Sequence, residues 1–165
     1  MRLSTNFHLD EFTRSRFAEG GRVKPTHQQI YCIKILVSSI MQSVRDKFGK
    51  IRITSGIRDK SVHDGLIKHG YPASVTSDHL AWCTVNPYGT GACDFIPLEA
   101  NLKEVFLWIS SNCIYGQLII YPEDGFIHVS NEWESLFKHL TRSKFKQPLL
   151  VRKDGAYHIY EEGVL

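Results

Sequence analysis

The sequence predicts a small domain of the α+β class built around a single core. Apolar residues recur every three or four positions between residues 27 and 48, which indicates one long amphipathic helix. Strand-like runs flank short turns within 117–130 and 149–160, which indicates two antiparallel hairpins. A chain of 165 residues can bury most of its apolar surface without added cross-links. We therefore expect one domain, 1–165.

Local signals place the ends of the predicted elements. Thr26 is positioned as the N-cap of the long helix, and Gly49 as the residue that ends it. The β-branched alternation of 51–54 predicts a strand that ends at Ser55-Gly56. The elements expected between this strand and the first hairpin are a short helix at 59–70, a loop at 71–77, a central strand at 92–96 and a helix at 102–110.

The last part of the chain, 131–165, is predicted to extend the same domain. Residues 133–140 are helix-like, and Asp154-Gly155 is a strong signal for a tight hairpin turn. No linker rich in Gly, Ser or Pro separates this part from the rest. The second hairpin should therefore add strands to the main sheet.

Charge and hydropathy narrow the classes of partner. A formal charge of +3 and a pI of about 8.7 permit attraction to an anionic polymer such as a cell wall. This positive charge is too small to indicate a nucleic-acid-binding protein. The sequence also has no basic stripe with interleaved aromatic residues. There is no apolar run of transmembrane length and no secretory signal at the N-terminus, so we expect synthesis in the cytoplasm and no membrane insertion.

The four cysteines are expected to be free thiols that act as small apolar residues, because the expected cytoplasmic origin disfavours disulfides. They are Cys32, Cys83, Cys93 and Cys113. One alternative stays open: Cys83 and Cys93 would form a disulfide outside the cytoplasm.

Three residues form a candidate metal site: His79, Asp94 and His128. Two imidazoles and one carboxylate are a ligand set of catalytic zinc, whose fourth position is left to water. A structural zinc would more often use cysteines, and the chain has no C-x-x-C pair. Spacing alone is weak support in a chain with eight histidines. The others are expected to face solvent: His8, His27, His63, His69, His139 and His158.

Five ordered blocks surround these residues. They are the segment 3–15, Ile53-Thr54-Ser55-Gly56-Ile57-Arg58, Ser77-Asp78-His79, Gly91-Ala92-Cys93-Asp94, and Gln117-Leu118-Ile119-Ile120 followed by Ile127-His128-Val129-Ser130. In this order they resemble the zinc D-Ala-D-Ala carboxypeptidase and L-Ala-D-Glu endopeptidase superfamily, particularly its bacteriophage branch. The resemblance covers about residues 3 to 130.

The resemblance implies both a fold and a function. The fold is a mostly antiparallel sheet that holds zinc in a groove, with helices packed on one side. The function is a zinc metallopeptidase that cuts peptidoglycan stem peptides as a carboxypeptidase or an endopeptidase, in a phage lysis enzyme or a virion-associated cell-wall hydrolase. Peptidoglycan is the expected partner, with other virion proteins as further candidates. The alternative is a non-catalytic virion structural or binding protein that keeps the fold, as related hedgehog proteins do.

The resemblance also assigns roles to residues beside the metal. Arg58 matches the family arginine that binds a substrate carboxylate, a task that suits its planar bidentate guanidinium. Ser77 is expected to support the ligands or the substrate. The chain departs from the family between His79 and Asp94, where fourteen residues replace the usual six. We expect the insertion to form a rim that includes Trp82 and Tyr88.

The general base is the weakest point of the match. The family carries a carboxylate four residues after the equivalent of Gln117, and this chain has Tyr121 there. Glu123 is the predicted base, with Asp124, or a site without a base, as alternatives. Tyr121 would either donate a hydrogen bond to the developing oxyanion or cap the hairpin.

The pairing within the first hairpin can be predicted from a four-residue loop, 122–125. That loop pairs Tyr121 with Phe126 and Ile119 with His128, and so places Tyr121 on the same face of the sheet as His128. His128 should share this face with Phe126 and Ser130, while Ile127 and Val129 point into the core.

Overall fold

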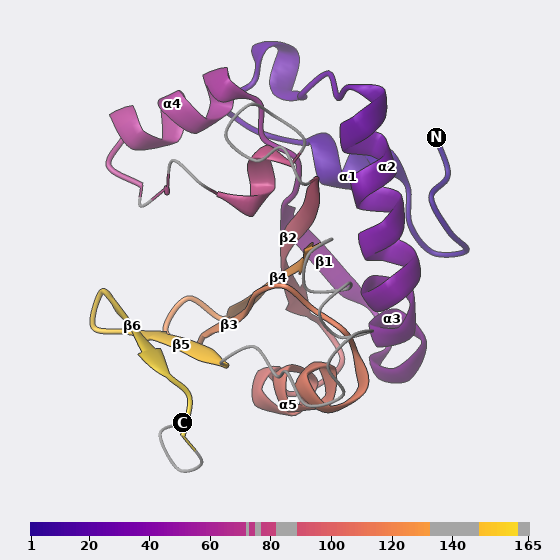
Figure 1. Ribbon diagram of the computed structural model, residues 1–165, viewed down its shortest axis with the longest axis vertical. Coiled ribbons are helices and arrows are strands. Elements are labelled where there is room, and N and C mark those ends of the chain that lie inside the picture. Colours follow the sequence, from indigo (N-terminus) through magenta and orange to yellow (C-terminus); the bar gives the residue numbers. More distant parts are fainter. Residues whose placement is uncertain (72, 75–76, 82–88, 133–148, 162–165) are drawn as a thin grey trace.

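A six-stranded sheet runs through the middle of the molecule in the computed structural model, which describes residues 1–71, 73–74, 77–81, 89–132 and 149–161 (Figure 1). Its strand order is β1-β2-β4-β3-β5-β6. Adjacent strands are antiparallel except β3 and β5, which are parallel. The strands are β1 (Ile51–Ser55), β2 (Thr90–Pro97), β3 (Leu118–Tyr121), β4 (Phe126–Glu132), β5 (Leu150–Lys153) and β6 (Ala156–Ile159).

The predicted long helix forms over its full length as three consecutive segments. They are α2 (His27–Leu36), a π turn (Val37–Met41) and α3 (Gln42–Phe48). Thr26 accepts from the backbone N–H of Gln29 while the Gln29 side chain accepts from that of Thr26, a capping box. Gly49 ends α3 with φ of 77°, a conformation that favours glycine. The π turn was not predicted.

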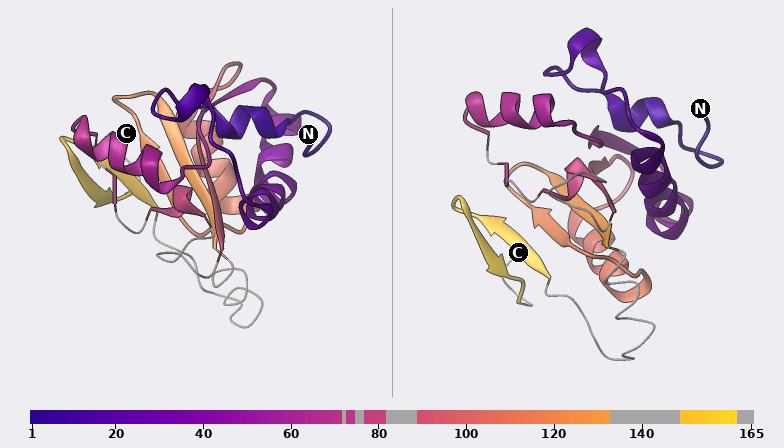
Figure 2. Two further views of the ribbon diagram at one scale, coloured as in Figure 1. Left: turned by 90° about the horizontal axis from the view of Figure 1, so that it is seen from above. Right: turned by 45° about the horizontal axis from the view of Figure 1, so that its top comes forward.

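The core lies between one face of the sheet and the layer of helices that covers this face. The segment from α2 to α3 covers β2, and α5 (Leu102–Asn112) covers β3 (Figures 1 and 2). Fully buried side chains from both layers fill this space, among them Ile33, Leu36, Ile40, Val105, Phe106, Ile109, Phe95, Ile120, Ile127 and Val129. The predicted α+β class with a mostly antiparallel sheet is confirmed, and the helices α2, α3 and α5 pack on one face as predicted, whereas α4 (Lys60–Lys68) lies on the other.

The opposite face of the sheet carries the side chains of Asp94 and His128, and we call it the metal face. The short elements α4 (Lys60–Lys68) and η3 (Asp78–Leu80) lie on this side of the molecule (Figure 1). At the N-terminus α1 (Leu9–Thr13) packs against β1, and η1 (Glu19–Gly21) follows it.

Both predicted hairpins form. Tyr121 pairs with Phe126 and Ile119 with His128, which confirms the predicted register. In the second hairpin Asp154 and Gly155 have φ of 50° and 74°, the two positive values that a type I′ turn requires. The pairing of β5 with β3 adds this hairpin to the main sheet, as predicted. The predicted helix at 133–140 lies outside the described residues.

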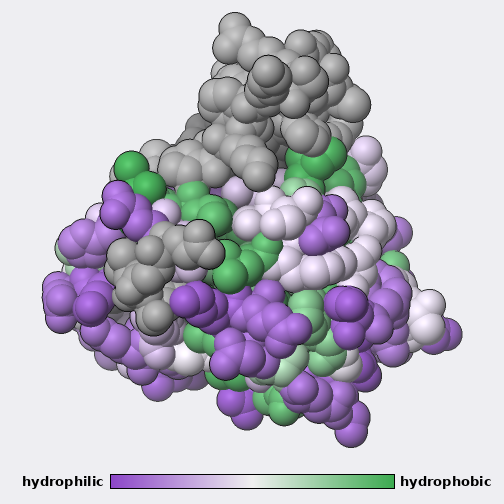
Figure 3. All heavy atoms as spheres, turned by 90° about the horizontal axis from the view of Figure 1, so that it is seen from below, coloured by the Kyte–Doolittle hydropathy of each residue, from purple (hydrophilic) through white to green (hydrophobic). Residues whose placement is uncertain are grey.

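The described cysteines, Cys32, Cys93 and Cys113, are free thiols, as expected. Cys93 is fully buried, and its Sγ lies 3.6 Å from Sδ of Met41. Its proposed disulfide partner, Cys83, lies outside the described residues. The described part of the chain has no helix long and apolar enough to span a membrane. Hydrophilic side chains predominate on the described part of the face shown in Figure 3, with hydrophobic ones in small groups between them.

Two glycines provide a matched test of how closely α2 approaches β2. A Cβ on Gly91 would lie 2.5 Å from the backbone oxygen of Cys32, whereas on Gly65 its nearest neighbour is Cβ of Phe17 at 3.4 Å. Gly91→Ala should therefore lower the free energy of unfolding by about 1–3 kcal/mol. Gly65→Ala, within α4, should raise it or leave it unchanged. Urea unfolding measures both, and equal stability of the two variants would contradict the predicted close contact.

Candidate metal centre

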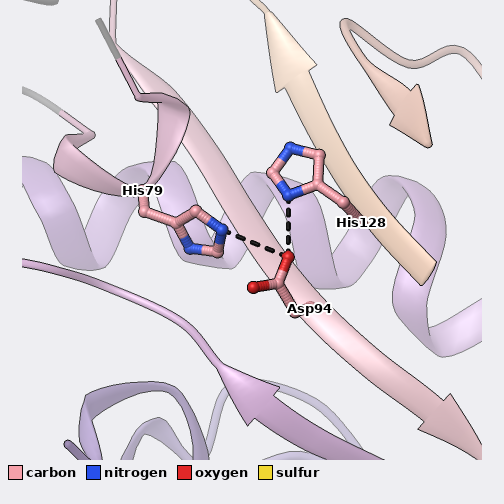
Figure 4. A group of neighbouring side chains, drawn as sticks. All are labelled: His79, Asp94 and His128. Atoms are coloured by element: carbon pink, nitrogen blue, oxygen red, sulfur yellow. Dashed lines mark hydrogen bonds and ion pairs between the residues drawn. The ribbon is translucent and has the colours of Figure 1, made fainter. Parts of the chain in front are cut away.

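Three segments that are distant in sequence bring His79, Asp94 and His128 together (Figure 4). His79 lies in η3, Asp94 in β2 and His128 in β4. Asp94 and His128 face each other directly across the β2–β4 pair. One ligand atom from each residue lies within 4.8 Å of the other two. The structure thus assembles the candidate site that was predicted from sequence.

The orientation of His79 leaves a lone pair facing the carboxylate. Its Nδ1 lies 2.7 Å from the carbonyl oxygen of Gly56. Because a carbonyl oxygen can only accept, Nδ1 carries the proton and Nε2 of the neutral ring is an acceptor. Nε2 lies 3.2 Å from Oδ1 of Asp94, which is also an acceptor. Two acceptor atoms this close together repel each other unless a cation lies between them. A metal ion would be such a cation.

His128 approaches the same carboxylate oxygen from β4. Its Nδ1 lies 2.8 Å from Oδ1 of Asp94, and its ring centroid lies 5.0 Å from that of His79. The other nitrogen of His128, Nε2, is buried with no hydrogen-bond partner among the described residues. The two imidazoles and Oδ1 of Asp94 therefore converge on one point.

Burial and charge set the protonation of the group. Burial raises the pKa of Asp94, but the adjacent His79 and His128 outweigh this effect and lower that pKa overall. Burial lowers the pKa of His79, although Asp94 opposes the change. At neutral pH the site therefore combines an ionised carboxylate with a neutral His79. These are the forms that bind a metal.

Arg58 approaches the second oxygen of the carboxylate. Its Nη2 lies 3.5 Å from Oδ2 of Asp94 and donates to Oγ of Ser55 at 3.0 Å. The backbone N–H of Arg58 donates to the carbonyl oxygen of His79 at 2.8 Å, which ties the segment between β1 and α4 to η3. Burial lowers the pKa of Arg58, while Asp94 and Tyr121 oppose the change. The predicted substrate-binding arginine thus lies beside the candidate metal ligands.

Asp78 and Ser130 support the site, and neither was assigned this role from sequence. Ser130 donates to Oδ2 of Asp78 at 2.6 Å, and both residues are buried. Ser130 lies two residues after His128 on β4, and Asp78 precedes His79, so this bond ties the two ligand-bearing segments together. The sequence offered one signal for this role, because each residue lies within a motif that contains a candidate histidine ligand. Ser77 begins η3 without a side-chain capping bond.

The candidate base lies apart from the three ligands. Glu123 and Asp124 are exposed in the β3–β4 turn. Neither belongs to the group of candidate metal ligands found among the described residues. Glu123 lines a pocket with Ile120 and residues of α5, on the helix side of the sheet. Tyr121, in contrast, lies on the metal face, as predicted from the register. The predicted rim residues Trp82 and Tyr88 lie outside the described residues.

One expectation about the other histidines was wrong. His63 is buried, with 4% of its surface exposed, and both of its ring nitrogens lack a hydrogen-bond partner among the described residues. The reason is its place on the inner side of α4 next to Val62, which packs into the core. The expectation of solvent exposure is confirmed for His8, His27, His69 and His158, and His139 lies outside the described residues.

No protein-family model, curated protein or solved structure matches this chain. The resemblance of the five motif blocks to the zinc peptidase superfamily therefore stays a prediction from the sequence. What the geometry shows is a buried His79–Asp94–His128 group that could hold a metal ion.

Metal binding can be tested at the ligands themselves. The wild-type chain should bind one zinc ion, and His79→Ala should weaken binding by about 100-fold or more, because loss of a ligand costs more than loss of its outer-sphere partner. His158→Ala removes an exposed histidine of β6 and should bind as the wild type does. Equilibrium dialysis against a chelator of known affinity measures all three proteins. Equal affinity of the two variants would contradict the site.

Proposed function

We propose that this chain is a zinc-dependent peptidase that cleaves peptide bonds in peptidoglycan stem peptides, in a phage lysis enzyme or virion-associated hydrolase. The observation that carries the proposal is the convergence of two imidazoles and a carboxylate next to the Arg58 guanidinium. This is the ligand set of a catalytic zinc site, which leaves one position open. The order of the motif blocks supports the substrate class.

Each residue of the centre has a separate task in this proposal. His79, Asp94 and His128 hold the zinc ion. A bound zinc ion supplies a Lewis acid that polarises a carbonyl and lowers the pKa of a water molecule. The carbonyl of Gly56 fixes the orientation of His79, because it accepts a hydrogen bond from Nδ1–H.

Arg58 is suited to bind a substrate carboxylate. Its described side-chain contacts, to Ser55 and Asp94, both use Nη2. A guanidinium has five N–H donors in a fixed planar arrangement, so donors remain for a bidentate contact with a carboxylate. About 14% of the Arg58 side-chain surface is exposed, which leaves an edge accessible to a ligand.

Peptidase activity is tested by the amines that hydrolysis releases. Zinc-loaded protein incubated with purified peptidoglycan should release new amino groups, and mass spectrometry of the products identifies the bond. His79→Ala should abolish this release because it removes a zinc ligand, and His158→Ala should retain it. A zinc-loaded wild-type protein that releases no amine from the peptidoglycan of any candidate host, while control enzymes do, would refute the proposal.

A binding protein without turnover is the second candidate. The position of Glu123 favours it, because this exposed turn residue lies with α5 residues on the helix side rather than with the ligands. A peptidase needs a base that accepts a proton from water and delivers it to the leaving amine. In the peptidase proposal Glu123 is the candidate for this role.

Glu123→Gln separates the two candidates. If Glu123 is the base, kcat should fall by about 10²- to 10⁴-fold with zinc content unchanged. Asp124→Asn, one residue away and also exposed, tests the alternative base: loss of activity in this variant alone would assign the role to Asp124. Unchanged activity of Glu123→Gln removes Glu123 as the base. Zinc-dependent affinity for peptidoglycan without turnover in the wild type favours the binding protein.

A further inference from the structure

The C-terminal hairpin places two side chains on the metal face. The strand register connects Asp94, His128, Ile119 and Leu150 in one row across β2, β4, β3 and β5. Alternate residues of a strand point to the same face, so Arg152 lies on the metal face with Leu150. Tyr157 faces the same way, because it is the partner of Arg152 in the β5–β6 pair.

These side chains contact each other next to the metal site. The ring of Tyr121 stacks on Phe126, with centroids 4.1 Å apart, and its hydroxyl lies 3.2 Å from that of Tyr157. The guanidinium of Arg152 lies over the Tyr157 ring, 4.7 Å from its centroid. Burial and the hydrogen bond shared with Tyr157 raise the pKa of Tyr121; Asp94 also raises it and Arg152 lowers it. Tyr121 thus lies within electrostatic range of both the metal carboxylate and Arg152.

Arg152 has no carboxylate partner among the described residues. The ion pairs found there involve Arg22, Lys50, Arg58, Lys60, His79 and His128. A guanidinium stacked on an aromatic ring keeps its N–H edge available for a bidentate contact. Arg152 is therefore a positioned cation on the metal face whose charge no described side chain neutralises.

Arg58 and Arg152 lie on opposite sides of the metal ligands. Arg58 follows β1, the ligands Asp94 and His128 lie on β2 and β4, and Arg152 lies on β5. Neighbouring strands are about 4.8 Å apart, so β5 lies about 10 Å from β4. An extended peptide advances about 3.3 Å per residue and covers that distance in about three residues.

We propose that Arg152 binds a second, internal carboxylate of an acidic peptide that lies across the strands, about three residues from the bond held at the metal and on the side away from Arg58. Tyr157 positions the guanidinium. The inference rests on the proposed function, because it names how that site would recognise its substrate. It makes the C-terminal hairpin a wall of the substrate site, although this hairpin lies beyond the segment that resembles the peptidase superfamily.

The test uses two forms of one ligand and two matched variants. The ligand is a synthetic stem peptide with a free C-terminal carboxylate, whose internal carboxyl group is either free or amidated. Zinc-loaded wild type, Arg152→Gln and Lys153→Gln are titrated by calorimetry, and the recovered peptide is checked for cleavage by mass spectrometry. Lys153 is the control, because it carries the same charge in the same hairpin but lines the pocket on the helix side.

The wild type should bind the free-acid peptide about tenfold more tightly than the amide, the effect of one hydrogen-bonded charge pair. Arg152→Gln should lose this preference and Lys153→Gln should keep it. A wild type that does not distinguish the two peptides overturns the inference without any variant. So does a preference that survives in Arg152→Gln, or one that Lys153→Gln loses equally.

Binding and cleavage, measured on the same peptides, test the carboxylate site and the peptidase activity separately. An Arg152-dependent preference on a peptide that is never cut supports the carboxylate site and counts against the peptidase. Cleavage by Arg152→Gln with the wild-type KM for both peptides overturns the carboxylate site and leaves the peptidase in place.

Discussion

The Asp94 carboxylate is the charge around which the rest of this molecule is arranged. Its Oδ1 faces both histidines, and its Oδ2 faces Arg58. A buried carboxylate costs several kcal/mol unless charged or hydrogen-bonding groups surround it. Its three partners come from β4, from η3 and from the residues that follow β1, so the carboxylate is stable only when the whole frame holds them in place.

Side chains alternate between the two faces of the sheet along each strand, and this alternation connects the charged centre to the apolar core. On β4, the side chains of His128 and Ser130 lie on the metal face, while those of Ile127 and Val129 are fully buried under the helices. A slip of one residue would turn the histidine into the apolar core and the apolar side chains onto the metal face. The packing of α2, α3 and α5 therefore fixes the position of His128 as firmly as it fixes the core.

The geometry supports a metal more directly than it supports hydrolysis. The ligands, the carbonyl behind His79 and the neighbouring Arg58 form one connected group of described contacts. The proposed base stands apart from that group, because a tight turn carries Glu123 past the strand to the helix side. Tyr121 lies at the strand position facing the metal, and a phenol with a raised pKa donates a hydrogen bond rather than accepting a proton from water.

The sequence by itself determined the long helix with its caps, the register of the first hairpin, the Asp154-Gly155 turn and the three candidate ligands. These depend on apolar periodicity, turn residues and short motifs, which act over a few neighbouring positions. Only the tertiary structure decided the Asp78–Ser130 bond, the burial of His63 and the place of Arg152 on the metal face. Each depends on contacts between segments distant in the chain, such as the parallel pairing of β5 with β3, and no local pattern specifies such contacts.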